Sequence, residues 1–312
     1  MDNLTHSLVG AVMGRMGLKR LSPRAMPAMI IAVNLPDIDS FVAKGLGCEP
    51  IAAHRGFTHG IAGDLLMPFF AVAIIFVWEK LRPGKEGALN LKGLLVACFL
   101  AGLSHPLLDL MNTYGTRVLD PFSSRWFYAD TLFIVDPWIW IMLILGLEMS
   151  WRAERLGSDW RRPAAWAFTA MLLYIGLNGA ISARAVAVTR PLVEHVTASS
   201  DIVAGEVPLT FWKRRMIWRS GAIGGSGTYD LLGGLNNARL DPKIVSLNLD
   251  DPRLAAAKAS DPHVRAFLYW SRMPMVYLER GHAYLTDQRF FEYRRTPSTN
   301  FLIPLDNHHV SS

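Results

Sequence analysis

The chain has 312 residues, of which 51% are hydrophobic and 19% are charged, and its formal net charge is +6 at pH 7. With a mean hydropathy of +0.22, it is too apolar for an ordinary soluble protein and too charged for a wholly membrane-embedded one, so a membrane part joined to a soluble part is expected. The two cysteines, Cys48 and Cys98, are isolated in the sequence, which excludes a disulfide framework and a cysteine-based zinc site.

Apolar segments in the first 188 residues predict membrane helices. Two short segments, at 4–18 and 25–36, are expected to form helices that pack inside a bundle. Longer apolar segments follow at 62–78, 93–111, 132–149 and 164–188. Because a bilayer core needs about 20 apolar residues per helix, with about 17 as the lower limit, each longer segment can span a membrane. The sequence therefore predicts a mainly α fold, a polytopic membrane helical bundle with four long spans plus two short N-terminal helices.

From about residue 189 the composition becomes mixed, and no membrane-length apolar run follows. The pattern predicts strands at 209–219 and 276–288, turns in the glycine-rich segment 221–234, and a helix with one apolar face at 251–269. We therefore expect two domains: a membrane-embedded helical domain at 1–188 and a small soluble α+β domain at 189–312.

Basic residues gather in three connecting segments, at 15–24, 80–92 and 152–162. If all six apolar segments cross the membrane, these segments lie on one side, which the positive-inside rule makes cytoplasmic. Trp126, Trp138 and the histidine motifs then lie on the other side. The prediction is a multi-pass inner-membrane protein with its candidate site and C-terminal domain outside the cytoplasm. Basic loops of this kind favour a lipid bilayer as partner over nucleic acid.

His105 and Asp109 carry the first sign of a site. They are four residues apart in a segment with a helical pattern, so both project from one helix face and can reach one ion. Pro106 suits a first helical turn, which would place a helix start near Ser104. A buried hydrogen bond between the two side chains is an equally good explanation of the pair.

His54 and His59 flank Arg55 in the motif His-Arg-Gly-Phe-Thr-His. Five residues apart, they do not align on a straight helix, but Gly56 allows a turn that brings both rings together. A guanidinium between two potential ligands is suited to binding a phosphate or carboxylate, so Arg55 is expected to neutralise a phosphoryl group. A polar interfacial loop is the alternative.

Asp37 and Asp39 end the apolar segment at 25–36, where both can approach ions, or one can bind while the other orients a histidine. His6 lies near the start of the first helix, and His6, His59 and His105 each follow a Thr or Ser that can orient the ring. Asp136 is a further candidate ligand, although a carboxylate at a helix start also has a structural explanation.

These motifs resemble the YdjM-type family of membrane-bound proteins described as metal-dependent hydrolases. The resemblance rests on Leu-Thr-His-Ser at 4–7, Leu-Pro-Asp-Ile-Asp at 35–39, the histidine motif at 54–59 and Ser-His-Pro-Leu-Leu-Asp at 104–109, and it covers residues 1–188. The family is distantly similar to zinc-dependent phospholipase C and P1-type nucleases, which cluster zinc ions with His and Asp. The resemblance implies a phosphoester substrate. The family's matched candidates are His6, Asp37, His54, His59, His105 and Asp109.

The predicted function is hydrolysis of a phosphoester in a lipid or lipid-linked substrate by metal-activated water, with Asp39 bridging ions or orienting the water. The candidate ligands outnumber the four of one tetrahedral zinc site, so two or three ions are expected, with zinc, manganese and iron all open. A metal-transport protein or a non-catalytic scaffold is the alternative. A peptidase is less favoured because the sequence has no His-Glu-x-x-His pattern.

Overall fold

The computed structural model describes residues 1–45, 49–85, 87–197, 200–291 and 301–306, so Cys48 lies outside the described residues. The chain divides into two compact units. One comprises Met1–Leu46 and Ala53–Gly179, and the other comprises Gly47–Ala52 and Ala180–Ser312. The domain boundary expected at 188 falls inside one long helix, α8 (Arg161–Glu194), which runs from the first unit into the second.

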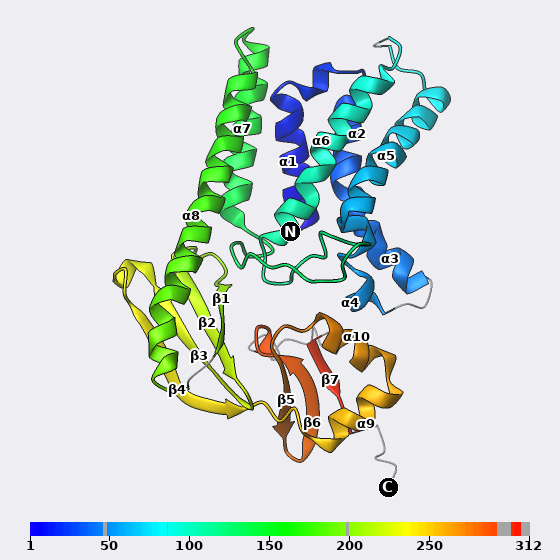
Figure 1. Ribbon diagram of the computed structural model, residues 1–312. Helices are drawn as coiled ribbons and strands as arrows, with labels where there is room; N and C mark the ends of the chain where they lie inside the picture. The colour runs from blue at the N-terminus through cyan, green and yellow to red at the C-terminus, as the bar shows by residue number, and fades with distance from the viewer. Residues whose placement is uncertain (46–48, 86, 198–199, 292–300, 307–312) are drawn as a thin grey trace. The chain divides into compact units, whose positions relative to one another are not determined.

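The first unit is a bundle of helices (Figure 1). Its helices before α8 are α1 (Asn3–Arg15), α2 (Ala25–Asn34), α3 (Ile38–Gly45), α5 (Ile61–Leu81), α6 (Leu91–Leu110) and α7 (Pro137–Arg155). The 3-10 turns are η1 (Leu18–Arg20), η2 (Leu35–Asp37) and η3 (Phe57–His59). Helix α2 packs against α1 and α6, and α5 packs against α6. Small buried residues, such as Ala28 and Ala32 of α2 and Ala97 and Ala101 of α6, allow this close approach.

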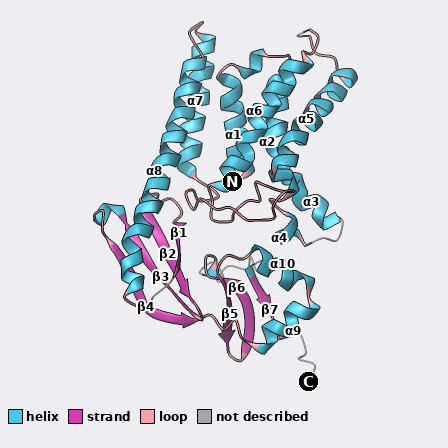
Figure 2. Ribbon diagram, in the orientation of Figure 1, coloured by secondary structure: helices cyan, strands magenta, loops and turns pink. Residues whose placement is uncertain are grey.

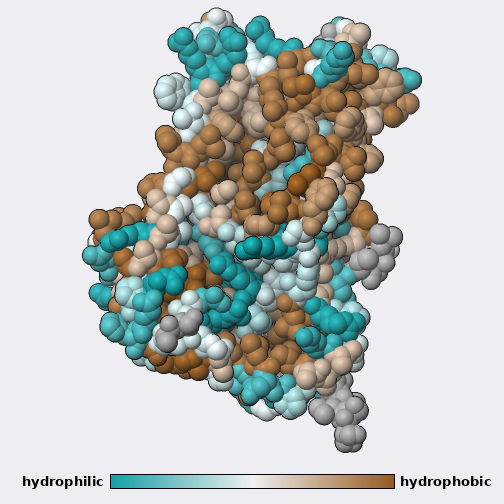
Figure 3. Space-filling model, viewed as in Figure 1, coloured by the Kyte–Doolittle hydropathy of each residue, from teal (hydrophilic) through white to brown (hydrophobic). Residues whose placement is uncertain are grey.

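Successive helices run in opposite directions, so the connections between them lie at two opposite ends of this bundle. The start of α1, the end of α2, the start of α5 and the end of α6 meet at one end, whereas the α1–α2, α5–α6 and α7–α8 connections lie at the other end (Figure 1). The histidine and aspartate motifs lie at the first of these ends, and the basic segments lie at the second. Large apolar side chains cover the exposed flanks between the two ends (Figure 3).

Four helical stretches are long and apolar enough to cross a membrane: Ala25–Ala43, Ile61–Leu81, Leu91–Leu110 and Arg161–Glu194. The prediction of a mainly helical fold with four long apolar helices is confirmed, but the set of four differs from the expected one. The segment at 25–36 is not short, because helical backbone continues through η2 and α3. The segment at 132–149 forms α7, which begins only at Pro137 and contains Glu148, Arg152 and Glu154, too many charges for such a span.

Among its described residues, the second unit contains two antiparallel sheets, the last part of α8 and two shorter helices (Figure 2). The first sheet has the order β1-β2-β3-β4, with β1 (Asp201–Glu206), β2 (Lys213–Ser220), β3 (Ile223–Asp230) and β4 (Ala238–Ser246). The second has the order β5-β6-β7, with β5 (Pro274–Glu279), β6 (His282–Asp287) and β7 (Leu302–Pro304). The helices are α9 (Pro252–Ser260) and α10 (Pro262–Trp270), and the short elements are α4 (Pro50–Ala53) and η4 (Leu231–Gly233).

The glycine-rich segment at 221–234 is mainly a strand, so its prediction as turns is wrong. Tertiary packing explains β3. The Trp218 ring of β2 packs so closely on Gly225 that a Cβ there would lie 2.6 Å from the ring, and a Cβ on Gly227 would lie 2.4 Å from the Arg239 carbonyl oxygen. Glycine here permits close approach of neighbouring groups within a sheet.

Three other expected elements have different bounds. The strand expected at 209–219 begins at Lys213. The strand expected at 276–288 is the β5–β6 hairpin, whose turn residues Arg280 and Gly281 have φ of 50° and 86°, as a two-residue hairpin turn requires. The helix expected at 251–269 is two helices, because Asp261 leaves the helical conformation and caps α10, which begins with Pro262.

Candidate metal centre

His105 and Asp109 lie in the last turns of α6, and both are fully buried. The helix is continuous from Leu91, so it does not start near Ser104, and Pro106 is accommodated inside it. Nδ1–H of His105 donates to the Val33 carbonyl oxygen at 2.7 Å. This bond fixes the tautomer of the ring and leaves Nε2 as the nitrogen that can bind a cation.

His59 reaches the same place from η3. It is fully buried, and its Nδ1 lies 3.0 Å from Thr58 Oγ1 and 3.3 Å from Asp39 Oδ2. These acceptors hold the proton on Nδ1, so Nε2 is again the free nitrogen. A Cβ on Gly56, which precedes this turn, would displace the guanidinium of Arg117 from its present position.

Four ligand atoms converge between these elements. Nε2 of His59 lies 3.0 Å from Nε2 of His105, and Oδ1 of Asp37 lies 3.5 Å from each nitrogen. Oδ2 of Asp109 lies 3.3 Å from the His59 nitrogen and 3.7 Å from the His105 nitrogen. Four ligands placed tetrahedrally about 2.0–2.1 Å from a zinc ion would be roughly 3.3 Å apart. These residues can therefore hold one divalent ion.

The two imidazoles supply an electrostatic argument for a cation. With both Nδ1 atoms protonated, two nitrogen lone pairs face each other at 3.0 Å, an arrangement that needs a positive charge between them. Burial disfavours a charged His59, yet hydrogen bonds and attraction from Asp109, Asp37 and Asp39 outweigh burial and raise the pKa of His59 to about 10. With three carboxylates around it, the His59 ring is stabilised when it carries a second proton or binds a metal ion.

His6 gives independent support. Its ring stacks on that of His105, with centroids 3.9 Å apart, and its Nε2 lies 3.4 Å from Asp109 Oδ1. The side chain is fully buried, yet neither ring nitrogen makes a hydrogen bond. Buried polar atoms normally make hydrogen bonds, so the lack of them on both His6 ring nitrogens supports a role for His6 as a metal ligand. The Met1 nitrogen also contacts Asp109.

Asp39 occupies a different position from Asp37. Its Oδ1 lies 2.8 Å from Nδ1 of His54, and its Oδ2 accepts hydrogen bonds from the Thr58 hydroxyl at 2.8 Å and the Arg55 N–H at 3.0 Å. Together with His54 and His59 it forms a second potential ligand group. Its contacts organise the whole loop from 54 to 59, and Ser40 also contacts the His54 ring nitrogen at 2.9 Å.

Arg55 is only 2% exposed, and protein groups surround its guanidinium. Nε lies 3.0 Å from Asp109 Oδ2, one terminal nitrogen donates to Asn112 Oδ1 at 2.8 Å, and the group stacks over the Tyr114 ring. The structure thus places Arg55 beneath the ligand group, where it offsets the charge of Asp109 and holds it in position.

Asp136 belongs to neither potential ligand group among the described residues. It caps α7 by accepting from the N–H groups of Trp138 and Ile139, and it accepts a hydrogen bond from the Tyr174 hydroxyl. Of the hydroxyls that precede the histidines, Thr58 contacts its ring as expected. Thr5 instead donates to Asp2, and Ser104 donates to a main-chain oxygen of its own helix.

Sequence reasoning missed two supports of the site. Asn112 follows Asp109 by three residues, a spacing that could have identified it as a neighbour on the same turn. The Val33 carbonyl group, which orients His105, leaves no signal in the sequence because every residue carries one.

Comparison with known proteins identifies a matching family and similar proteins. The family model described as YdjM inner membrane protein matches residues 1–185. The protein belongs to this family. It is 31% identical to inner membrane protein YbcI of Escherichia coli (strain K12) over 181 residues, which cover 49% of this chain and 98% of that protein. The YdjM match contains every residue of the two ligand groups.

A longer relative extends the similarity. The chain is 27% identical to uncharacterized protein YfhP of Bacillus subtilis (strain 168) over 228 residues, which cover 68% of this chain and 64% of YfhP. The match therefore spans slightly less than two thirds of YfhP. No solved structure matches the chain. Membership of the YdjM family establishes an inner-membrane protein with several candidate spans.

Proposed function

We propose that this protein is a membrane-bound, metal-dependent hydrolase that cleaves a phosphoester in a lipid or lipid-linked substrate. The observation that carries the proposal is the close group of ligand atoms from Asp37, His59, His105 and Asp109, which all lie within 4.8 Å of one another. Three of these side chains are fully buried, whereas the side chain of Asp37 is 20% exposed, so the group has one side open to solvent.

One ion fits this set, and Asp109 can join it to a second. Oδ2 of Asp109 lies 3.3 Å from Nε2 of His59, while Oδ1 lies 3.4 Å from Nε2 of His6 and also contacts the Met1 nitrogen. A bridging carboxylate is the usual feature of paired-ion sites. Bound divalent ions would supply Lewis-acid polarisation and a more acidic water, as hydrolysis at neutral pH requires. Zinc, manganese and iron all accept such nitrogen and oxygen ligands.

His54 is the best placed residue for proton transfer. Its side chain is 23% exposed, and Asp39 and Ser40 contact its Nδ1 at 2.8 and 2.9 Å. A carboxylate behind an imidazole orients the ring, as in other general acid–base pairs. We therefore assign Asp39 to positioning and Arg55 to holding Asp109, and give neither a direct contact with the phosphoryl group.

A lipid or lipid-linked substrate fits the surroundings of the site. Apolar side chains within two residues of the ligands in sequence are exposed, namely Ile38, Phe57 and Leu107. The site also lies at one end of a bundle whose flanks are apolar, where lipid headgroups meet the hydrocarbon. We place this end outside the cytoplasm because the basic connections lie at the other end.

Metal analysis and a chelator test address the proposal together. The purified full-length chain should contain tightly bound divalent metal and hydrolyse a lipid phosphoester, and a chelator should abolish the activity until metal is returned. Asp109→Asn should lose both metal and activity. Asp136→Asn, which removes a buried helix-capping carboxylate, should keep its metal. Activity that survives the chelator, or full metal content in Asp109→Asn, would contradict the proposal.

A further inference from the structure

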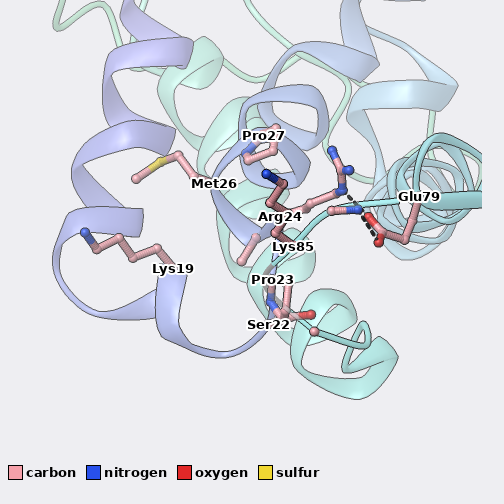
Figure 4. Close-up of a pocket in the computed structure, with 11 residues that line it drawn as sticks. Lys19, Ser22, Pro23, Arg24, Met26, Pro27, Glu79 and Lys85 are labelled. Atoms are coloured by element: carbon pink, nitrogen blue, oxygen red, sulfur yellow. Dashed lines mark hydrogen bonds and ion pairs between the residues drawn. The ribbon is translucent and has the colours of Figure 1, made fainter. Parts of the chain in front are cut away.

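The opposite end of the bundle contains a cavity of about 460 Å³. It lies between the α1–α2 connection, the start of α2 and the α5–α6 connection, and Figure 4 shows the side chains around it. Its volume is within the range of sites that bind small molecules, roughly 300–1,000 Å³. The YdjM ligand groups contribute no residue to it.

Cations outnumber anions in the lining. It contains Lys19, Arg24 and Lys85 and one carboxylate, that of Glu79. Both oxygens of Glu79 already accept hydrogen bonds, one from Arg24 and the other from the Gly84 N–H at 2.8 Å (Figure 4). In the part of the chain that the structure describes, no ion pair joins the ammonium group of Lys85 to a carboxylate. The cavity therefore has a net positive charge that the described residues do not neutralise.

The neighbourhood adds to this charge. Lys19 binds Glu154 at 2.6 Å, but Glu154 also binds Arg15, so one carboxylate serves two cations. Helix α2 begins at the cavity without a side-chain cap, and its N-terminal end is positive. Arg24 has a φ of 59°, and its guanidinium donates hydrogen bonds to Glu79 and to the Arg82 carbonyl oxygen. Its guanidinium is therefore fixed at the cavity wall.

The lining also contains apolar side chains, among them Pro23, Met26 and Pro27 (Figure 4). A wall that combines cations with apolar groups fits an amphiphile better than a free ion. The cavity also lies at the ends of membrane-length helices, at the level of lipid headgroups. We propose that this cavity binds the phosphate group of an anionic membrane lipid, such as phosphatidylglycerol, with Lys85 as the residue that contributes most to charge recognition.

Native mass spectrometry of the full-length chain, released from a neutral detergent, measures this binding directly. Phosphatidylglycerol, phosphatidylcholine and inorganic phosphate are offered separately. We expect retention of phosphatidylglycerol and weak or no retention of the other two. Lys85→Gln should weaken phosphatidylglycerol binding about fivefold, the effect of one basic residue at an anionic surface. Lys85 is exposed in a connection, so the variant should fold normally.

Lys92→Gln is the matched control, because Lys92 is an exposed lysine at the same end that does not line the cavity. Equal losses in the two variants would show a general surface-charge effect and overturn the proposal. Equal binding of phosphatidylcholine, or saturation by inorganic phosphate that prevents lipid binding, would also overturn it. The metal content should be the same in all three proteins, which separates this result from any failure of the proposed hydrolase.

Discussion

The role of Asp39 can be tested by replacing it with asparagine, which keeps the volume and removes the charge. Asp39 accepts hydrogen bonds from Thr58 and from the Arg55 main chain, and it contacts ring nitrogens of His54 and His59. Outer carboxylates that orient metal-binding histidines typically contribute 10–100-fold to metal affinity. We therefore expect Asp39→Asn to weaken zinc binding by about 10–100-fold, or about 1.4–2.7 kcal/mol.

A graded series strengthens the measurement. Thr58→Val removes one hydrogen bond to Asp39 and leaves the carboxylate in place, so its effect should be about fivefold, the value of one net hydrogen bond. Ser40→Ala removes only a 3.3 Å contact with Asp39 and a 2.9 Å contact with His54, and should change affinity less. Competition against a chromophoric chelator measures all three affinities. Equal affinity in Asp39→Asn and Ser40→Ala would refute a positioning role for Asp39.

Three further predictions concern folding and orientation. Burial opposes the charge of Asp287, but Arg289 at 2.9 Å outweighs it and lowers the pKa of Asp287. A carboxyl group whose pKa is lower in the folded state than in the unfolded state contributes its full stabilisation of the fold above the unfolded-state pKa, which is about 4 for aspartate. Asp287→Asn should therefore reduce the free energy of unfolding by about 3–5 kcal/mol at pH 7. In denaturant titrations this deficit should shrink as the pH falls below about 4, and a deficit independent of pH would contradict the charge argument. Gly225→Ala should cost about 1–3 kcal/mol in the same assay because its Cβ meets the Trp218 ring, and an unchanged midpoint would contradict the packing account. Reporter fusions at Lys85 and at the C-terminus should be cytoplasmic and extracytoplasmic respectively, and two cytoplasmic signals would refute the proposed orientation.

The spacing of His105 and Asp109 was sufficient to predict that they lie together, because residues four apart in a helix project from the same face. The motif from His54 to His59 could be expected to turn at Gly56, but its partners could not be assigned. The backbone path from η2 into α3 determines whether Asp37 or Asp39 faces the other ligands. No short sequence motif predicts that path. The contacts of Arg55 with Asp109 and Asn112 depend on tertiary packing in the same way.

The soluble part was harder to predict for a physical reason. Glycine has low intrinsic strand preference, so Gly224, Gly225 and Gly227 indicated turns, whereas the neighbouring side chains of the sheet require their small size. Proline and aspartate gave the better signals. Asp261 followed by Pro262 ends one helix and starts another, and attention to that pair would have divided the expected helix correctly.

The ligands of the proposed centre come from segments that are far apart in the sequence, from His6 near one end of the membrane unit to Asp109 a hundred residues later. An ion held by Asp37, His59, His105 and Asp109 would be a reversible cross-link between η2, η3 and α6. At a free concentration 100 times its dissociation constant, such an ion stabilises the folded bundle by about 2.7 kcal/mol. Cells starved of that metal would then hold less of this protein as well as less active protein, because the loosened helices become substrates for membrane proteases.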